Sequence, residues 1–372
     1  MPTQPFDEVQ DLSQNIVRKL TDPPRANSPV LLAASMKSAC EDFVVEEVPK
    51  YLPSGSGEHL FLWIEKQGVA AGAFLQHVQR TLEIQERDIG AAGQKDRHAV
   101  TRQFISIPVR CRPLLKNLDT DRIRLLSVSA HGNKLRTGHL VGNQFQIVLR
   151  NADSPFSSHD VSSVSSRLKH LSAEGFPNYF GPQRFGHQGN TVNEGIRVFR
   201  GNAATAAPRR RKKGRQKRFA MSAIQSAVFN LVLAERVAEF SFTKPKDGDV
   251  VCRRDGIRPF LFDDRGDTSA ADLVPMGPMP GRKMMAATGE VASHEAAVIE
   301  ELKLTPDDFA NSSKQMPGTR RKMVEFPSNC SAALTADGAI SVRFHLPAGS
   351  YATVLLAEIC GDLMDASQVE NP

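Results

Sequence analysis

Two repeating patterns of apolar residues organise the first half of the chain. Apolar positions three and four apart predict amphipathic helices over residues 71–82 and 160–171, with Gly175 as a stop signal after the second. Short apolar or alternating runs, the first two joined by a Ser-Gly turn at 54–57, predict strands over residues 41–49, 59–68, 103–109 and 144–150. This order of strands and helices favours an α+β domain.

A strand-rich pattern returns near the end of the chain. Asp337-Gly338 is a hairpin turn signal, and the residues after it alternate between apolar and polar over 340–346. A Pro-Ala-Gly break follows, and 350–360 then has the composition of a helix. Strand-rich segments at both ends of a mixed middle predict one α+β domain interrupted by an inserted domain.

The middle of the chain has a different composition. Residues 175–195 are rich in Gly, Asn and aromatic side chains, which favours a functional loop over a packed element. A helix is predicted over 220–237, whereas 265–290 is rich in Gly, Pro and Met and is expected to be irregular. We therefore expect a loosely packed N-terminal extension over 1–28, a main domain over 29–174 and 326–372, and an inserted domain over 175–325.

Length and composition support this division and exclude several classes of protein. A chain of 372 residues exceeds the size at which one hydrophobic core readily grows, so two domains are expected. No apolar run is long enough to span a membrane, and the first residues resemble neither a signal nor a transit peptide. The five cysteines are scattered and never spaced as CxxC, which argues against a disulfide framework or a zinc site and favours the cytoplasm.

The positive charge of the chain is concentrated in one segment. The net charge is +6, and residues 208–218 hold eight Lys or Arg and no acid, so the rest of the chain carries −2. Such a run is either a solvated linker or a loop that contacts phosphates. The pattern by itself does not decide between these two interpretations.

One carboxylate has an unusual setting. Asp96 is the only acid in residues 91–106, where its neighbours include Lys95, Arg97, His98 and Arg102. It is either a turn residue in a surface ion-pair cluster or an ionised nucleophile. The sequence has no GxSxG, HExxH, Walker A or GxGxxG motif, and its histidines are too dispersed to suggest a metal site.

Several aromatic residues lie beside Gly or Asn. Rings in such settings stack on bases that are extruded from RNA, or they anchor a core. Sequence alone leaves both interpretations open for the set Phe145, Tyr179, Phe180, Phe185 and Tyr351.

Six segments, in the same order along the chain, resemble the tRNA pseudouridine synthase D family. They are KSACEDFVVEE at 37–47, GQKDRHAVTRQ at 93–103, GHLVGNQFQIVLR at 138–150, FPNYFGPQRFG at 176–186, DGD at 247–249 and RFHLPAGSYAT at 343–353. The resemblance implies a permuted pseudouridine synthase catalytic domain, an α+β fold around a bent mixed sheet, with a family-specific inserted α/β domain. It also implies isomerisation of uridine, typically uridine-13, to pseudouridine in transfer RNA, with no cofactor.

The resemblance assigns roles to particular residues. Asp96 matches the catalytic aspartate, and Lys37 matches an active-site lysine. Substrate contacts are implied for Phe43, Asn143, Phe145 and Tyr351. Cys40 stands where the family often has proline, which leaves the chemistry intact but alters the local turn.

The resemblance also bears on the partners of the chain. Transfer RNA is the expected partner, and nothing in the sequence indicates a membrane or an obligate protein partner. RNA contacts are a further hypothesis for the basic loop residues Arg209, Arg210, Arg211, Lys212 and Lys213.

Two other functions compete with this interpretation. A non-catalytic RNA-binding protein could retain the fold, although every matched motif residue is intact. A tRNA methyltransferase would need a cofactor loop that is not apparent in the sequence. Attack at C1′, attack at C6 and a glycal route are not distinguished by the sequence.

Overall fold

The chain forms two compact units in a computed structural model, which describes residues 11–30, 32–93, 95–200, 214–263, 272–310 and 316–368. Pro29–Glu174 and Phe326–Pro372 form one unit, which we call the large-sheet unit. Met1–Ser28 and Gly175–Glu325 form the other, which we call the inserted unit. Each unit is described separately below.

The large-sheet unit is built from strands, with three α-helices along its described residues. Its helices are α2 (Ala71–Leu82), α3 (Ser158–Glu174) and α8 (Ala352–Cys360). Its strands are β1 (Ser35–Met36), β2 (Phe43–Pro49), β3 (His59–Gln67), β4 (Gly90–Ala91), β5 (Val100–Pro108), β6 (Ile123–His131), β7 (Leu140–Leu149), β14 (Ser328–Leu334), β15 (Ile340–Pro347) and β16 (Met364–Asp365).

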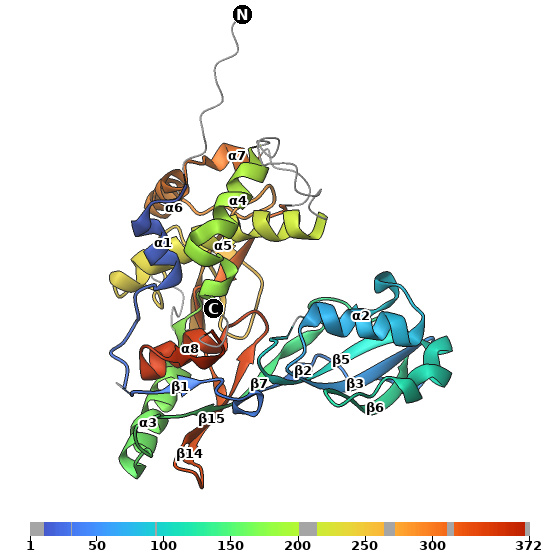
Figure 1. The fold of residues 1–372 in the computed structure, drawn as a ribbon. Coiled ribbons are helices and arrows are strands. Elements are labelled where there is room, and N and C mark those ends of the chain that lie inside the picture. Colours follow the sequence, from blue (N-terminus) through green and yellow to red (C-terminus); the bar gives the residue numbers. More distant parts are fainter. Residues whose placement is uncertain are drawn as a thin grey trace, which may run out of the picture. The chain divides into compact units, whose positions relative to one another are not determined.

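Most of these strands form a single mixed sheet in the order β14-β15-β7-β2-β5-β3-β6 (Figure 1). β2 and β5 pair in parallel and the other neighbours on this path are antiparallel, while β4 pairs with β5 beside the path. The sheet joins the two parts of the sequence that form this unit, because β15 pairs with β7. A separate two-stranded parallel pair joins β1 to β16.

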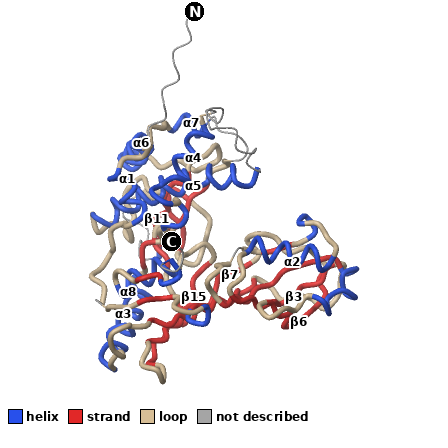
Figure 2. The backbone as a smooth tube through the Cα atoms, in the orientation of Figure 1, coloured by secondary structure: helices blue, strands red, loops and turns tan. Residues whose placement is uncertain are grey.

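Alternating apolar residues explain how α2 attaches to this sheet. Leu60, Leu62 and Ile64 of β3 lie on one face, and Phe74 and Val78 of α2 pack against them in one core cluster. The helical spacing of the α2 residues and the two-residue period of β3 are both visible in the sequence. Figure 2 shows α2 lying along the strands it covers.

The inserted unit centres on a long helix. Its helices are α1 (Gln14–Thr21), α4 (Asn190–Phe199), α5 (Gly214–Ala238), α6 (Gly289–Glu301) and α7 (Pro306–Ala310). Its strands are β8 (Phe176–Pro177), β9 (Val250–Arg253), β10 (Phe260–Leu261), β11 (Leu273–Met279), β12 (Thr319–Lys322) and β13 (Val324–Glu325). Four of them form a sheet in the order β10-β9-β11-β12. Among the described residues of the whole chain, no helix is both long and apolar enough to cross a membrane.

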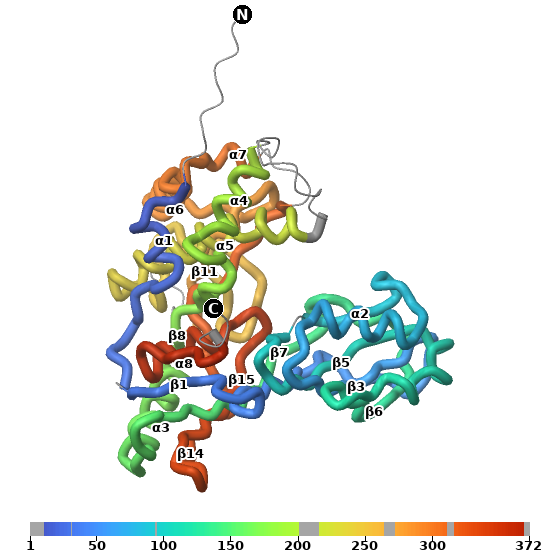
Figure 3. The backbone as a smooth tube through the Cα atoms, in the orientation of Figure 1, coloured from blue at the N-terminus to red at the C-terminus, as the bar shows by residue number. Residues whose placement is uncertain are grey.

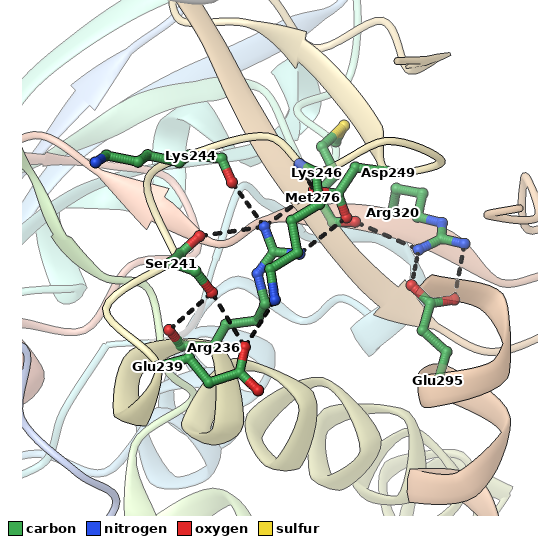
Figure 4. Close-up of polar contacts among 9 residues, drawn as sticks. All are labelled: Arg236, Glu239, Ser241, Lys244, Lys246, Asp249, Met276, Glu295 and Arg320. Atoms are coloured by element: carbon green, nitrogen blue, oxygen red, sulfur yellow. Dashed lines mark hydrogen bonds and ion pairs between the residues drawn. The ribbon is translucent and has the colours of Figure 1, made fainter. Parts of the chain in front are cut away.

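Two buried ion pairs lie in the core of the inserted unit (Figure 4). Arg236 of α5 donates to Asp249 at 3.2 and 2.9 Å, and Arg320 of β12 pairs with Glu295 of α6. Burial raises the pKa of Glu295, and the Arg320 guanidinium opposes that shift. Removing one partner of such a pair leaves a buried charge uncompensated. The DGD segment at 247–249 therefore has a structural part in the inserted unit.

Residues 11–28 are packed rather than loose, while residues 1–10 of the expected extension lie outside the described residues. Leu20 of α1 is fully buried, and α1 lies against α5, as Figure 3 shows by the colours of the two segments. Ser13 caps α1 by accepting a hydrogen bond from the backbone N–H of Ile16. Residues 11–28 thus belong with 175–325.

Two predictions for the middle of the chain were wrong. Residues 273–279, expected to be irregular, form β11, and its prolines are compatible with a strand because their carbonyls still accept: Met323 donates to Pro275. Residues 175–195, expected to be a loop rather than a packed element, are packed; their part in function stays a prediction. The reason is burial, since Phe176 and Phe185 are completely enclosed and Tyr179 is 2 % exposed.

Candidate functional site

Asp96 lies in the segment that connects β4 to β5 in the large-sheet unit. Its side chain is 48 % exposed, so the carboxylate is accessible from solvent. Pairing of Gly90 and Ala91 with β5 fixes one end of this segment, and the start of β5 fixes the other. The sheet therefore presents an accessible carboxylate on a short connection between two paired strands.

Lys37 lies between two carboxylates. Its ammonium is 3.6 Å from Oδ2 of Asp96 and 3.6 Å from Oδ2 of Asp365, and its side chain is 5 % exposed. Its Nζ also stands 4.6 Å from the centroid of the Phe43 ring. The backbone of Lys37 is left-handed, with φ of 59°, a conformation that costs a non-glycine residue on the order of 1 kcal/mol. Strain is thus stored at a buried lysine that faces an accessible carboxylate.

A second buried lysine supports the backbone of the Asp96 segment. Lys66 of β3 is 1 % exposed and donates to the backbone carbonyls of Val69 at 2.8 Å and Asp96 at 3.0 Å. Burial lowers the pKa of Lys66 to about 8; Asp96 and Cys40 act against that shift, and Lys95 adds to it. The position of the Asp96 backbone therefore depends on a desolvated ammonium.

The basic residues around Asp96 have different partners. Lys95 forms a buried ion pair with Glu47 at 2.9 Å, and Arg102 pairs with Glu46 and Glu65. Arg97 is exposed. Lys95, next to Asp96 in the sequence, is therefore an internal anchor of the segment and not a surface cation.

Strand register places Asn143 beside this anchor. Asn143 of β7 lies directly opposite Glu47 of β2, so both side chains are on the same face of the sheet. Oδ1 of Asn143 and Oε1 of Glu47 are buried and have no hydrogen-bond partner among the described residues. Two buried acceptor oxygens of the described residues therefore lack donors on the face of the sheet where Lys95 anchors the Asp96 segment.

The aromatic residues of the predicted site divide into two groups. Phe43 is 1 % and Phe145 6 % exposed, and they form a buried cluster with Phe344 in which Phe145 and Phe344 stack at 5.4 Å. Tyr351, by contrast, is half-buried at the N-cap of α8. Phe43 thus packs against the Lys37 ammonium with Phe145 beside it, whereas Tyr351 is not fully enclosed.

The structure does not place the remaining candidate residues at the Asp96 site. The basic loop residues Arg209, Arg210, Arg211, Lys212 and Lys213 lie outside the described residues. Tyr179 donates to the carbonyl of Pro24 at 3.2 Å, which makes it a core anchor of the inserted unit.

Three residues that contact the Asp96 segment or Lys37 were not singled out from the sequence. The sequence pattern could have indicated that Lys66 is buried, because it continues the inward-facing positions Leu60, Leu62 and Ile64 of β3. Glu47 lies on the inward face of β2 by the same alternation. No sequence pattern indicated Asp365, because only the pairing of β16 with β1 brings it to Lys37.

Comparisons with known proteins define first the fold and then the family. The crystal structure of a putative tRNA pseudouridine synthase D (TruD) from Methanosarcina mazei matches with a TM-score of 0.70 at 21 % identity, covering 96 % of this chain and 100 % of that one. The fold is therefore the α+β fold of that structure, with its mixed sheet.

The family follows from the sequence comparisons. A family model of tRNA pseudouridine synthase D (TruD) matches residues 32–210 and 211–359. A tRNA pseudouridine synthase D from Anaeromyxobacter dehalogenans is 37 % identical over 336 residues, 87 % of this chain and 92 % of that protein. One from Thermus thermophilus is 36 % identical over 330 residues, covering 86 % of each. The chain belongs to the tRNA pseudouridine synthase D family.

Proposed function

We propose that this chain isomerises uridine to pseudouridine in transfer RNA, at uridine-13, with Asp96 as the essential group and with no cofactor. Family membership supports the reaction class and the RNA substrate. The single structural observation that supports the choice of Asp96 is its pairing with Lys37: an accessible carboxylate lies 3.6 Å from a buried ammonium. A cation at this distance can hold a carboxylate in one orientation, which covalent catalysis by a carboxylate requires.

The proposed role of Lys37 follows from its geometry. The reaction breaks an N-glycosidic bond, rotates uracil and forms a C–C bond, so the carboxylate must keep one orientation while the base moves. Lys37 is held by Asp365 and the Phe43 ring, and it fixes Oδ2 of Asp96 from the buried side. The other carboxylate oxygen is then left to act on the ribose or the base.

We assign recognition of uracil to Asn143 and Tyr351. Extruding a base from an RNA helix costs a few kcal/mol, which contacts in the pocket must return. The Asn143 amide can accept from the uracil N3–H and donate to a uracil oxygen; its Oδ1, which is buried and has no donor among the described residues, would have to become accessible as the base enters. Tyr351 would stack on the base, and Phe43 and Phe145 would support this site from below.

The test is Asp96→Asn, which keeps the size of the side chain and removes its charge. We expect pseudouridine, detected by carbodiimide labelling of a transfer RNA transcript, to fall below detection while the variant still binds the transcript. Asp121→Asn, at an exposed carboxylate in the same unit, is the matched control and should behave as the unaltered chain. Turnover by Asp96→Asn at the unaltered rate contradicts the assignment, and RNA binding without any turnover by the unaltered chain favours the non-catalytic alternative.

The basic loop belongs to the same proposal as an RNA contact. Arg209, Arg210, Arg211, Lys212 and Lys213 carry five positive charges without an acid between them. Each phosphate that they neutralise adds about 0.7 to 0.9 to the slope of log affinity against log salt. Replacing all five by Ser should flatten that slope. An unchanged slope would assign the loop to a solvated linker.

A further inference from the structure

A cavity of about 560 Å³ lies in the large-sheet unit outside the residues assigned to the reaction. Three separate segments form it: the residues after β2, the end of β6, and the loop between β6 and β7. Its lining residues are Tyr51, Leu52, His131, Asn133, Lys134, Arg136 and His139. The volume falls in the range of about 300–1,000 Å³ that small-ligand sites occupy.

The lining combines rings with cations and includes no acid. Tyr51 stacks with His131 at 5.2 Å between ring centroids, and its hydroxyl and His139 Nδ1 share a hydrogen bond of 2.6 Å. The Lys134 ammonium donates one hydrogen bond to the carbonyl of Arg87, which holds the charged group in place and leaves two further N–H groups for a ligand. Arg136 is exposed, and its side chain makes no ion pair or hydrogen bond to any residue that the structure describes. The chemistry therefore fits a ligand that carries both an anionic group and a flat ring.

The cavity is shaped in advance. Gly57 has φ of 129°, and a Cβ at this position would lie 2.4 Å from the backbone of His131, so the segment after β2 packs directly onto the end of β6. Tyr51 also packs against the buried cluster of Phe61, Ala92 and Leu135. A ligand would thus meet an ordered wall and lose little affinity to reorganisation.

The cavity is connected to the Asp96 segment through the same backbone. Gly138 donates to the carbonyl of Ala92 at 3.3 Å, and Ala92 precedes Asp96 by four residues. The loop that carries Lys134 and Arg136 continues into β7, which carries Asn143. A ligand in the cavity would therefore contact a loop that is linked to both the Asp96 segment and the strand that carries Asn143.

We propose that this cavity binds one unpaired nucleotide of the RNA substrate other than the target uridine, with its phosphate at Lys134 and Arg136 and its base against Tyr51. The proposal rests on the proposed function, because it takes RNA as the ligand. Stacking on an aromatic ring tolerates any base, so the site secures the strand and leaves the choice of uridine to the Asp96 side.

The phosphate part is tested with the double variant Lys134→Ala/Arg136→Ala. Its control is Arg112→Ala/Lys116→Ala, which removes the same charge from two exposed residues outside the cavity. We expect the double variant to raise the Kd for a transfer RNA transcript about fivefold or more, and to reduce the salt slope by about 1.4, as for two phosphates of a single strand. KM should rise with Kd while kcat changes less than twofold.

The stacking part is tested with Tyr51→Leu and Tyr51→Phe. Leucine keeps the packing against Phe61 but removes the ring, so Kd should rise several-fold. Phenylalanine keeps the ring and removes only the hydroxyl bond to His139, so Kd should stay within twofold of the unaltered chain. Thermal unfolding shows whether each variant is folded, and the cation variants carry the test if Tyr51→Leu is not.

The outcomes separate this inference from the proposed function. Unchanged Kd and salt slope in Lys134→Ala/Arg136→Ala overturn the inference, and so does an equal loss in the control pair. Pseudouridine formation with unchanged KM in the double variant refutes the cavity and leaves the function in place. If the unaltered chain makes no pseudouridine but the Kd values change as expected, the function fails and the RNA site stands.

Discussion

Replacing Lys66 by methionine should slow the proposed reaction far more than it destabilises the fold. Lys66 is enclosed in the sheet and holds the backbone of Asp96 through one hydrogen bond of 3.0 Å, with a second of 2.8 Å to Val69. Methionine fills a similar volume but cannot donate. The Asp96 segment then loses the only hydrogen bond that the described residues show from β3 to its carbonyl.

The loss of stability is expected to be small because the lost hydrogen bonds are partly offset by the removal of a buried charge, whereas nothing offsets the catalytic loss. A hydrogen bond with one charged partner contributes about 1.5–3 kcal/mol, so the two bonds together contribute about 3–6 kcal/mol. Burial disfavours the charged form by about 3 kcal/mol, since it lowers the pKa from 10.5 to about 8. The net loss of unfolding free energy is then about 0–3 kcal/mol. Without the hydrogen bond from Lys66, Asp96 is less firmly positioned for the reaction. We therefore expect kcat to fall about 10- to 100-fold.

The lowered pKa adds a pH dependence with a definite sign. The folded chain releases the Lys66 proton near pH 8, while the unfolded chain keeps it to about pH 10.5. The unfolded state binds more protons in this window, so this group makes stability rise with pH there; its burial penalty is fully present below pH 8. The neutral amine donates weaker hydrogen bonds, so kcat of the unaltered chain should decline above pH 8. Lys66→Met should lack that decline.

The assay compares single-turnover pseudouridine formation with urea unfolding over pH 6.5–9.5. Lys116→Met, at an exposed lysine of the same unit, controls for the loss of a charge. A value of kcat for Lys66→Met within twofold of the unaltered chain would refute the reasoning. An alkaline decline that persists in Lys66→Met would assign that decline to another group.

Three further changes have defined outcomes. Gly142→Ala puts a Cβ 2.1 Å from the Leu346 carbonyl oxygen and should lower the free energy of urea unfolding by about 1–3 kcal/mol, whereas Gly72→Ala, with open space around it, should not. Asp249→Ala strands the buried Arg236 guanidinium and should cost about 3–5 kcal/mol in the same measurement; a loss below about 1 kcal/mol would contradict this. Asp365→Asn leaves Lys37 with Asp96 alone, and should lower stability by about 1–2 kcal/mol while retaining far more turnover than Asp96→Asn.

Local elements and the family were readable from the amino-acid sequence. The helical spacing over 71–82 and the alternation over 340–346 correspond to α2 and to most of β15, because an amphipathic period is a local property of the chain. The order of six motifs identified the family that the comparisons show. Asp96 was visible for the same reason, since its basic neighbours are adjacent in the chain.

Which side chains meet is a property of the tertiary structure. The sequence placed Lys95 beside Asp96 without its partner, and strand packing directs it into a buried pair with Glu47. Asp365 reaches Lys37 because β16 pairs with β1, although the two strands are far apart in the chain. The strand β11 and the packed segment 175–195 were both expected to be irregular, because residues rich in proline, glycine or aromatic side chains occur in loops as well as in cores. Burial and long-range pairing depend on what packs from elsewhere in the chain, and no local period records it.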